Sequence, residues 1–461
     1  MLNIQTDSRK IKPGDTFVAV KCEINDGHKY IDSAIKNGAT KIIVERKEKD
    51  YGVETIVVPN TREYVTEYLE KNYKDIINDI NLIGITGTNG KTTTAYLIYE
   101  AFNKVGVKCG YIGTVGFYLD KKITSLPNTS VDICDTYDLL LQAYDLGYKT
   151  IVMEVSSHAL VNNRLKGLSF KTGLFTNLTE DHLDFHKTME NYALAKQILF
   201  KMLRKDGVAI INNDDQYKQF FNLTKNKNIT YGFNNSSDYQ IVDYKMNNSN
   251  TLFTYKYNNE SYSINMNIIG KYNIYNALLT IIVLLNNGIK YEQIKEVFPS
   301  LTCPPGRLEV VPFKTNSIII DYAHTPDAIE KVIETIKPIT KGKLYTIFGC
   351  TGDRERAKRP IMSKIATDMS EYVIMTSDDP HNESMDQIID DMTNGLVNKN
   401  YEVIVDRGDA IEKGISLLKE HDSLLILGKG HEEYIIVKDQ FIPFNDRKVV
   451  NKILEASYIT E

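Results

Sequence analysis

The segment spanning residues 83–94, Ile-Gly-Ile-Thr-Gly-Thr-Asn-Gly-Lys-Thr-Thr-Thr, has the residue types needed to bind a nucleotide phosphate. Apolar residues 82–85 predict a strand, and a helix expected over residues 93–105 would point its N-terminus at the loop between them. Glycines let backbone N–H groups approach an anion closely, and a helix N-terminus favours negative charge. We therefore interpret the loop as a nucleotide site, with ATP as the expected nucleotide.

Two side chains of this loop are suited to act on phosphates. Lys91 would reach the outer phosphates, and the Thr92 hydroxyl could coordinate magnesium. The spacing departs from the standard P-loop because Ile85 stands where that motif has a further glycine. A glycine-rich turn with an incidental lysine is the alternative. The order of strand, glycines, lysine, hydroxyls and helix disfavours it.

Two more polar residues follow predicted strands. Glu154 lies near the end of a strand expected over 150–155, and His182 follows one expected over 173–177. Together they could hold a magnesium ion that bridges phosphate and a substrate carboxylate. The alternative is that these segments only cap helices, but a buried Glu154 needs a cation or hydrogen-bond donors. Lys196, in a helix expected over 189–203, is an ordinary surface lysine by spacing alone.

Four predicted strands in the last third of the chain end in polar segments. These strands are expected over residues 317–322, 344–348, 372–376 and 424–427. Any one polar end could be a solvated turn. If all four converge on one sheet edge, their carboxylates and Arg354 suit a zwitterionic or polyamine-bearing ligand.

The alternation of helices with apolar strands predicts an α/β protein with mostly parallel sheets and three domains. Residues 1–80 form the first domain, with strands expected over 17–20, 41–44 and 55–58 and helices over 30–38 and 61–75. Residues 81–304 form the central domain, with a strand over 208–212, a small antiparallel insert near 228–270 and a helix over 274–285. After a linker at 303–306, residues 305–461 form the third domain, with a further strand over 402–405 and helices beginning at Pro326, Arg359, Glu383 and Asp409.

The bulk properties exclude several classes of protein. The 461 residues allow two to three domains, and a net charge of −5 implies no general affinity for nucleic acid. The N-terminus lacks a signal-peptide core, and no stretch is apolar enough to span a membrane. Five widely spaced cysteines (Cys22, Cys109, Cys134, Cys303 and Cys350) predict reduced thiols in a cytoplasmic protein.

At this point the sequence resembles the Mur ligases of bacterial cell-wall synthesis over nearly its whole length. The resemblance is closest to those that add a diamino acid to UDP-N-acetylmuramoyl-L-alanyl-D-glutamate. It implies a central P-loop-like ATP-binding domain between a UDP-sugar-binding α/β domain and a Rossmann-like ligase domain. The motifs that carry it are residues 86–93, 154–158, 179–182, 306–307, 321–324 and 428–432.

The resemblance also assigns roles to residues. The implied ATP contacts are Gly87, Thr88, Asn89, Gly90, Lys91, Thr92, Thr93, Asn273, Asn276, Arg307 and Asp321, the last two acting from the third domain upon closure. The implied contacts to the UDP-sugar and dipeptide are Ser8, His28, Asn128, Thr129, Ser130, Ser156, Asn162 and Arg164. Asn162 stands where glutamine is common.

The implied reaction is ATP-dependent amide formation with Mg²⁺. Lys91, Glu154, His182 and Lys196 are the expected catalytic residues, and Thr92, Glu154, His182 and Lys196 the expected metal ligands. Lys196 matches the family's carbamylated lysine, which reverses the surface interpretation because carboxylation turns a cation into a carboxylate. The substrates would be the UDP-N-acetylmuramoyl dipeptide and a free diamino acid, and a monomer is expected.

One motif departs from the family pattern. Enzymes that use meso-diaminopimelate typically have Asp-Asn-Pro-Arg, whose arginine pairs with the distal carboxylate, where this chain has Asp378-Asp379-Pro380-His381. His381 loses the bidentate fork, and Asp379 adds negative charge. Both changes favour L-lysine, with meso-diaminopimelate next. The expected amino-acid contacts are Arg354, Asp378, Asp379, Pro380, His381, Gly428 and Glu432.

Three other functions compete with this interpretation. A ligase like folylpolyglutamate synthase needs no UDP-sugar site, so residues 7–9 and 26–28 argue against it. A non-catalytic nucleotide-binding protein would not need Lys91, Glu154, His182 and Lys196 together. A P-loop small-molecule kinase would form no amide product.

Overall fold

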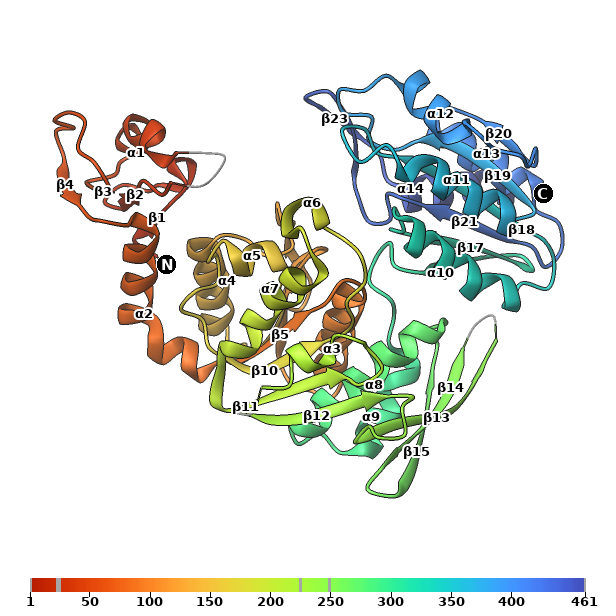
Figure 1. The fold of residues 1–461 in the computed structure, drawn as a ribbon, viewed down its shortest axis with the longest axis horizontal. Helices are drawn as coiled ribbons and strands as arrows, with labels where there is room; N and C mark the ends of the chain where they lie inside the picture. The colour runs from red at the N-terminus through yellow and green to blue at the C-terminus, as the bar shows by residue number, and fades with distance from the viewer. Residues whose placement is uncertain (1, 22–25, 224–225, 248–249, 460–461) are drawn as a thin grey trace. The chain divides into compact units, whose positions relative to one another are not determined.

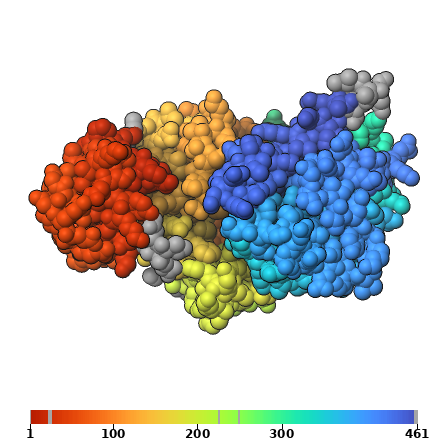
Figure 2. Space-filling model, turned by 90° about the horizontal axis from the view of Figure 1, so that it is seen from above, coloured from red at the N-terminus to blue at the C-terminus, as the bar shows by residue number. Residues whose placement is uncertain are grey.

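The computed structural model describes residues 2–21, 26–223, 226–247 and 250–459 (Figure 1; Figure 2). Contacts divide the chain into two compact units. The first comprises residues 1–241, 256–260 and 275–294, and the second comprises 242–255, 261–274 and 295–461. Helices packed on largely parallel sheets make up both units, as expected for an α/β protein. The domain boundaries near residues 80 and 304 remain predictions.

The N-terminal sheet is small and wholly parallel, in the order β1-β2-β3-β4. The three predicted strands and both helices are confirmed, with shifted ends. The last helix runs four residues beyond its predicted end because Ile77 continues the buried face begun by Val65 and Leu69. The elements are β1 (Ile4–Gln5), β2 (Thr16–Val18), β3 (Lys41–Val44), β4 (Glu54–Val57), η1 (Ser8–Lys10), η2 (Gly27–Tyr30), α1 (Ile31–Lys36) and α2 (Thr61–Asp79).

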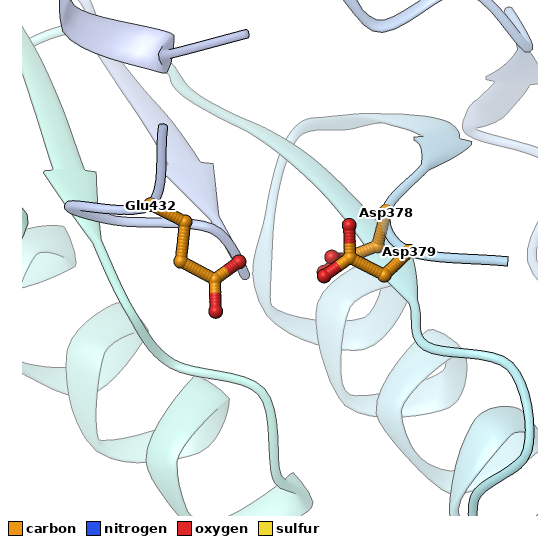
Figure 3. Close-up of side chains that lie close together, drawn as sticks. All are labelled: Asp378, Asp379 and Glu432. Carbon is orange, nitrogen blue, oxygen red and sulfur yellow. The ribbon is translucent and has the colours of Figure 1, made fainter. Parts of the chain in front are cut away.

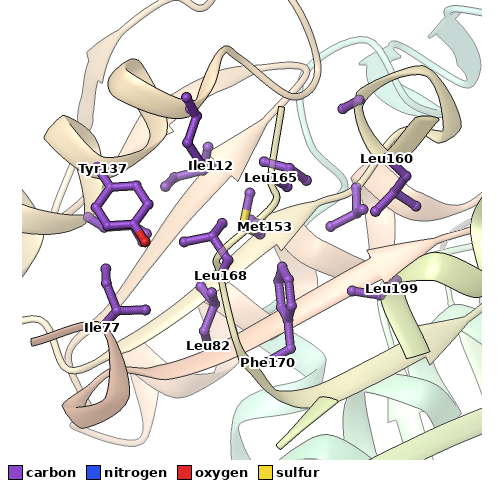
Figure 4. Close-up of a cluster of buried hydrophobic side chains, with 14 of the residues drawn as sticks. Ile77, Leu82, Ile112, Tyr137, Met153, Leu160, Leu165, Leu168, Phe170 and Leu199 are labelled. Atoms are coloured by element: carbon purple, nitrogen blue, oxygen red, sulfur yellow. The ribbon is translucent and has the colours of Figure 1, made fainter. Parts of the chain in front are cut away.

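The central sheet has β5 between β10 and β9, and its strands are parallel from β12 to β6. Its strands are β5 (Asn81–Thr86), β6 (Cys109–Gly113), β7 (Gly116–Tyr118), β8 (Lys122–Thr124), β9 (Thr150–Glu154), β10 (Phe170–Phe175), β11 (Leu203–Asn212) and β12 (Lys227–Gly232). Buried side chains such as Leu82, Met153 and Phe170 fill its core (Figure 4). The parallel order places the carboxyl ends of β5, β9 and β10 side by side.

Helices connect these strands and continue beyond them. They are α3 (Lys91–Lys104), α4 (Ile133–Asp145), α5 (Ser157–Val161), α6 (Leu183–His186), α7 (Met189–Lys201), η3 (Lys218–Phe220), α8 (Lys271–Asn286), α9 (Tyr291–Val297) and η4 (Phe298–Ser300). The predicted helices α3, α7 and α8 are confirmed, although α8 begins three residues earlier than expected.

The prediction of an antiparallel insert was wrong for its first strands. β12 pairs with β11 in parallel, and β13 (Tyr239–Met246) pairs with β12 in parallel. Alternating apolar residues do not reveal strand direction, and the connection over residues 213–226 is long enough for a crossover. β14 (Thr251–Tyr257) and β15 (Glu260–Met266) are joined by Asn258 and Asn259, both with positive φ, as in a tight hairpin.

The C-terminal sheet has the order β16-β17-β21-β18-β19-β20, with antiparallel β16 at one edge and the rest parallel. Successive residues of β21 face opposite sides, with Leu425 packed on α10, α11 and α12, and Ile426 packed on α13 and α14. Helices therefore cover both faces, as the Rossmann-like prediction requires. The strands with polar ends, β17, β21, β18 and β19, are neighbours, so their ends share one edge.

The elements of this sheet are β16 (Glu309–Phe313), β17 (Asn316–Asp321), β18 (Leu344–Cys350), β19 (Tyr372–Ser377), β20 (Tyr401–Val403), β21 (Ser423–Leu427), α10 (Pro326–Ile336), η5 (Lys337–Ile339), α11 (Lys358–Met369), α12 (Met385–Thr393), α13 (Arg407–Leu417) and α14 (Asp446–Ile459). A separate hairpin consists of β22 (Tyr434–Val437) and β23 (Gln440–Pro443). This hairpin, whose β23 residues are all exposed, was not predicted from the sequence, and neither were β16 and α14.

Cys109, Cys134, Cys303 and Cys350 are free thiols, as expected, and Cys22 lies outside the described residues. Over the described part of the chain, no helix combines the length and apolar character that crossing a membrane requires.

Candidate active site

The loop between β5 and α3 is shaped by two glycines with positive φ. A Cβ on Gly87 would lie 1.9 Å from Thr176 Oγ1, and one on Gly90 would lie 2.6 Å from Asn276 Oδ1. Gly90 caps the N-terminus of α3, so the first turn of the helix opens toward the loop. The glycines therefore also allow the end of β10 and the helix α8 to pack against the loop.

Hydrogen bonds from the segment after β10 hold this loop in place. The Thr88 N–H donates to the Asn177 carbonyl at 2.8 Å, and the Asn89 N–H donates to Asn177 Oδ1 at 3.0 Å. Thr176 Oγ1 donates to the Asn89 carbonyl at 2.7 Å. The loop is thus preorganised by its neighbour strand.

Lys91 is folded over the loop, where Nζ donates to the carbonyls of Gly87 at 2.9 Å and Thr88 at 2.7 Å. Phosphate oxygens could replace these carbonyls without moving the lysine far. Thr93 is buried in the first turn of the same helix, and Asn276 Oδ1 accepts a hydrogen bond from Thr94 at 3.1 Å. Asn276 is therefore at the loop, whereas Asn273 uses its amide to bond the Ile269 carbonyl at the start of α8.

Glu154 is fully buried, and its carboxylate accepts four hydrogen bonds. Oε1 accepts from the Tyr111 hydroxyl at 2.6 Å and the Thr114 N–H at 2.8 Å. Oε2 accepts from Thr92 Oγ1 at 2.8 Å and Thr114 Oγ1 at 3.2 Å. The capping alternative is therefore wrong for Glu154, whose donors surround a carboxylate placed directly against the nucleotide loop.

Lys196 is buried, with only 1% of its surface exposed, so the surface interpretation from spacing is wrong. Its Nζ donates to the Gly87 carbonyl at 2.7 Å and lies 4.3 Å from the centroid of the Tyr192 ring. Burial, together with the positive charge of Lys91, holds the pKa of Lys196 well below its ordinary value. The site therefore favours the neutral amine.

Three histidine rings gather beside this lysine. His182, in the left-handed region with φ of 53°, lies 4.8 Å from the His158 ring, and the His158 and His186 rings are 5.5 Å apart. His186 Nε2 bonds Ser157 Oγ at 2.9 Å, and burial lowers the pKa of His186 to about 4. Burial also lowers the pKa of His182, with Asp181 opposing it. The site therefore favours the neutral imidazole of His182.

The residues expected to bind the acceptor divide into two groups. Ser130 Oγ donates to the Glu154 carbonyl at 2.9 Å and accepts from the Ser156 N–H at 3.0 Å, and Thr129 bonds the Thr114 hydroxyl at 3.0 Å. These residues, which lie close to Glu154, form the first group. The others are Asn128, which is exposed, and Asn162 and Arg164, which are partly buried at and beyond the end of α5.

In the N-terminal domain, Ser8 is buried, and its carbonyl accepts a hydrogen bond from Asn37 Nδ2 at 2.9 Å. His28 Nδ1 bonds Asp26 at 2.7 Å, and His28 Nε2 accepts from the Glu45 N–H at 3.1 Å. Both ring nitrogens of His28 are thus used within the domain. The contact of His28 with the UDP-sugar remains a prediction.

In the C-terminal unit, Asp321 is buried and organises the end of β17. Its carboxylate accepts from the Leu308 N–H at 2.7 Å and the Ala323 N–H at 2.8 Å. Burial raises the pKa of Asp321, and nearby Arg307 opposes that rise. The Arg307 guanidinium lies 4.5 Å from the centroid of the Tyr322 ring. The two residues expected to bind ATP are therefore brought together.

Asp378, Asp379 and Glu432 lie together at the end of β19 and the loop after β21 (Figure 3). Lys429, fully buried, places Nζ 2.8 Å from Asp379, 2.8 Å from Glu432 and 3.6 Å from Asp378. An ammonium group thus already occupies the space that a metal ion would need. Asp379 also accepts the Ile436 N–H at 2.8 Å, so part of its charge is compensated, and its contact with the amino acid remains a prediction.

The remaining amino-acid candidates are held by backbone geometry. A Cβ on Gly428 would lie 2.6 Å from Asp378 Oδ2, and one on Gly352 would lie 1.9 Å from the Pro380 carbonyl. His381, with φ of 48°, donates its N–H to the Ile436 carbonyl at 3.0 Å. Arg354 is exposed. Asp378, Asp379, Pro380, Gly428 and Glu432 are therefore tightly clustered, whereas Arg354 projects into solvent.

Comparison with known proteins identifies the family. Family descriptions match over residues 2–83 (Mur ligase family, catalytic domain), 85–284 (Mur ligase middle domain) and 306–430 (Mur ligase, glutamate ligase domain). A Clostridium tetani relative, named UDP-N-acetylmuramoyl-L-alanyl-D-glutamate--2,6-diaminopimelate ligase, is 39% identical over 99% of this chain and 95% of its own length. This chain belongs to the Mur ligase family.

Solved structures agree with this assignment. A structure titled UDP-N-acetylmuramoyl-L-alanyl-D-glutamate--2,6-diaminopimelate ligase shares 31% identity with a TM-score of 0.71, covering 99% of this chain and 95% of its own. A Thermotoga maritima MurF ligase in complex with ADP, at 18% identity and a TM-score of 0.69, covers 99% and 97% and supports the fold. This Mur ligase is therefore an ATP-dependent ligase of peptidoglycan synthesis, for which Mg²⁺ is the usual partner ion.

The donor set of the Mur ligase fits Mg²⁺. A hydroxyl oxygen of Thr92 and a carboxylate oxygen of Glu154 lie 2.8 Å apart beside the phosphate loop, and oxygen ligands suit this ion. His182 and Lys196 lie nearby, and a carboxylated Lys196 would add another oxygen donor.

Several residues of the Mur ligase site were missed from the sequence. Tyr111 lies in β6, and Thr114 directly follows the end of this strand. The strand was not predicted because two of its five residues are glycine. Lys429 lies between two glycines and gave no periodic signal. Lys196 does lie in a periodic pattern, because Tyr192 and Leu199 are at helical spacing from it on the buried face of α7.

Proposed function

We propose that this Mur ligase joins a diamino acid to the D-glutamate γ-carboxylate of UDP-N-acetylmuramoyl-L-alanyl-D-glutamate. The observation that carries the proposal is the convergence of Lys91, Lys196 and the Thr92–Glu154 pair on one glycine loop. The name of the 39% identical Clostridium tetani relative supports the same acceptor.

The reaction proceeds in two steps. The γ-phosphoryl group of ATP passes to the γ-carboxylate, which gives an acyl phosphate and ADP. The neutral amine of the diamino acid then attacks the acyl carbon, loses a proton, and expels inorganic phosphate as the amide forms. Lys91 and the loop N–H groups stabilise charge on the transferring phosphoryl group.

Lys196 is proposed to be carboxylated on Nζ. A carbamate forms when a neutral amine adds to CO₂, and the buried site favours the neutral amine. The new carboxylate would carry negative charge beside Lys91, so it would attract the Lys91 ammonium group. Thr92, Glu154, His182 and carboxylated Lys196 would hold Mg²⁺, which supplies positive charge to the phosphate oxygens.

The proposed amino acid is L-lysine, with meso-diaminopimelate as the second candidate. His381 provides at most one hydrogen bond where an arginine fork would hold a distal carboxylate. The argument from Asp379 is weaker than expected because Lys429 compensates its charge. The name of the Clostridium tetani relative favours the second candidate.

The remaining site residues keep their proposed partners. Ser8, Asn128, Thr129, Ser130, Ser156, Asn162 and Arg164 are proposed to bind the UDP-sugar and dipeptide. Asn276, Arg307 and Asp321 are proposed to bind ATP, together with the loop residues. A cytoplasmic monomer is the proposed form of the protein, and its free cysteines favour a reducing compartment.

The test is ADP release and amide product from ATP, magnesium and the UDP-dipeptide with lysine, ornithine, meso-diaminopimelate or LL-diaminopimelate added separately. Turnover with lysine but not meso-diaminopimelate supports the L-lysine proposal. Turnover with meso-diaminopimelate alone contradicts that choice and leaves the ligase reaction in place. ADP release without any amide product contradicts the ligase reaction and indicates a kinase.

A further inference from the structure

Two sets of residues with different proposed partners meet at the side chain of Tyr322. Arg307 belongs to the ATP set and Glu432 to the amino-acid set. The Arg307 guanidinium lies over the Tyr322 ring, 4.5 Å from its centroid, and the Tyr322 hydroxyl donates to Glu432 Oε1 at 3.2 Å. One aromatic side chain therefore contacts one residue of each set, within the C-terminal unit.

The backbone around Tyr322 is interlocked. Gly306, which precedes Arg307, has φ of 67°, and a Cβ there would lie 2.1 Å from the His431 nitrogen. A Cβ on Gly430 would lie 2.8 Å from the Gly306 carbonyl oxygen and 2.9 Å from Tyr322 Cβ. These contacts join three segments, namely the segment before Arg307, the end of β17 and the loop before Glu432. The three segments thus pack without room for independent movement.

Arg307 also carries a group that calls for a ligand. Its Nε is buried and, among the described residues, has no hydrogen-bond acceptor. An unsatisfied buried donor is costly, and a phosphate oxygen would satisfy it. Glu432, in contrast, is held from two sides, by Tyr322 and by Lys429 at 2.8 Å. Its carboxylate is therefore fixed relative to the Tyr322 ring.

We propose that Tyr322 is a positioning residue that links the two substrates, with its ring fixing Arg307 for ATP and its hydroxyl fixing Glu432 for the ammonium group of the amino acid. This inference rests on the proposed function. Because both contacts are made by one rigid ring, a shift of Glu432 on amino-acid binding is transmitted to Arg307. Binding of either substrate then favours the other.

Two variants separate the contacts. Tyr322→Phe keeps the ring and removes the hydroxyl, so the apparent KM for the amino acid should rise about tenfold while that for ATP stays constant. Tyr322→Leu removes both contacts, so both values should rise, that for ATP about fivefold. Tyr345→Phe, which removes a hydroxyl from another tyrosine of the same sheet, is the matched control and should change neither value.

Double variants test the link directly. Tyr322→Phe with Glu432→Ala should raise the KM for the amino acid no further than Glu432→Ala alone, because the Tyr322 hydroxyl acts on the amino acid only through Glu432. Tyr322→Phe with Arg307→Lys should raise the KM for the amino acid no further than Tyr322→Phe alone, because loss of the hydroxyl already separates Arg307 from Glu432. An unchanged KM for the amino acid in Tyr322→Phe overturns the proposal. An equal loss of kcat in Tyr322→Phe and Tyr322→Leu, with the KM values of both substrates unchanged, also overturns it.

Failure of the proposed function is distinguishable from failure of this inference. If the wild type forms no amide product, the proposed function fails. Equilibrium binding of ATP and magnesium to wild type and Tyr322→Leu still tests the contact with Arg307 without turnover. Equal affinity of the two proteins for ATP then overturns the inference, and about fivefold weaker binding by Tyr322→Leu supports it.

Discussion

Lys196 Nζ donates a 2.7 Å hydrogen bond to the carbonyl of Gly87, 109 residues earlier in the chain. The bond ties the middle of α7 to the first glycine of the phosphate loop. A lysine in this position is buried and has Lys91 as a neighbour, so its ammonium form is disfavoured. This relationship makes Lys196 chemically unlike Lys201, the other lysine of its helix.

Replacement of Lys196 by alanine should abolish ligation, and bicarbonate cannot restore it because no amine remains. A short carboxylic acid that enters the cavity should restore part of the activity by supplying the missing carboxylate. Amide product formation measures both effects. Lys201→Ala, on the exposed end of the same helix, is the control and should keep full activity. Full activity in Lys196→Ala would remove the carbamate from the mechanism.

Much of the fold could be predicted from the sequence because its strands are short apolar runs followed by turn residues. The ends of β5, β9, β17 and β21 lie within one residue of their predicted positions. This accuracy was enough to place the phosphate loop and the polar strand ends on sheet edges. The direction of β12 could not be predicted, because a period of two carries no information about the partner strand.

The site could be predicted less completely than the fold. Side chains such as Glu154 could be identified because they end strands, whereas Lys429 and Asn177 act through contacts that only the fold creates. The compensation of Asp379 by Lys429 joins residues 50 positions apart. No local pattern reports such a pairing, so the motif alone did not reveal that Lys429 compensates part of the charge of Asp379.

Gly87→Ala should prevent ATP binding. The added Cβ would meet Thr176 Oγ1 at 1.9 Å, and either the loop or the end of β10 must move. We expect at least a hundredfold loss in kcat/KM for ATP, because the Lys91 contacts depend on the loop carbonyls. Gly106→Ala is the matched control, since Gly106 has φ of 86° but open space around it. Similar losses in both variants would indicate backbone strain rather than collision.

His186 should make the folded protein sensitive to acid. Burial lowers its pKa to about 4 from 6.5, so the unfolded chain binds a proton at higher pH than the folded chain does. The free energy of unfolding should therefore fall as pH decreases from 6.5 to 4, by about 1–3 kcal/mol from this residue.

Denaturant unfolding at pH 7.5 and 4.5 measures this contribution. His186→Gln, which can still bond Ser157, should show a smaller difference between the two pH values than the wild type. His421→Asn, at an exposed histidine, should keep the wild-type difference. Parallel pH dependence in all three proteins would assign the acid sensitivity to other groups.

Asp379→Asn should shift selectivity toward diaminopimelate. The cluster of Asp378, Asp379, Glu432 and Lys429 carries a formal charge of −2, and the change makes it −1. A distal carboxylate is then repelled less, so the ratio of kcat/KM for meso-diaminopimelate to that for lysine should rise about fivefold. Asp390→Asn, on the exposed side of α12, should leave the ratio unchanged.

His381→Arg should raise the same ratio further, because arginine offers a bidentate fork to the distal carboxylate. The backbone of residue 381 is fixed by the Ile436 carbonyl and by the Lys438 N–H, which donates to its carbonyl at 2.8 Å. The longer side chain should therefore extend from the same anchored point, at some cost from the positive φ. Competition between lysine and meso-diaminopimelate in one reaction measures the ratio, with His381→Lys as the matched control for charge without the fork. A ratio that rises equally in both variants would assign the effect to charge alone, and an unchanged ratio would exclude residue 381 from selectivity.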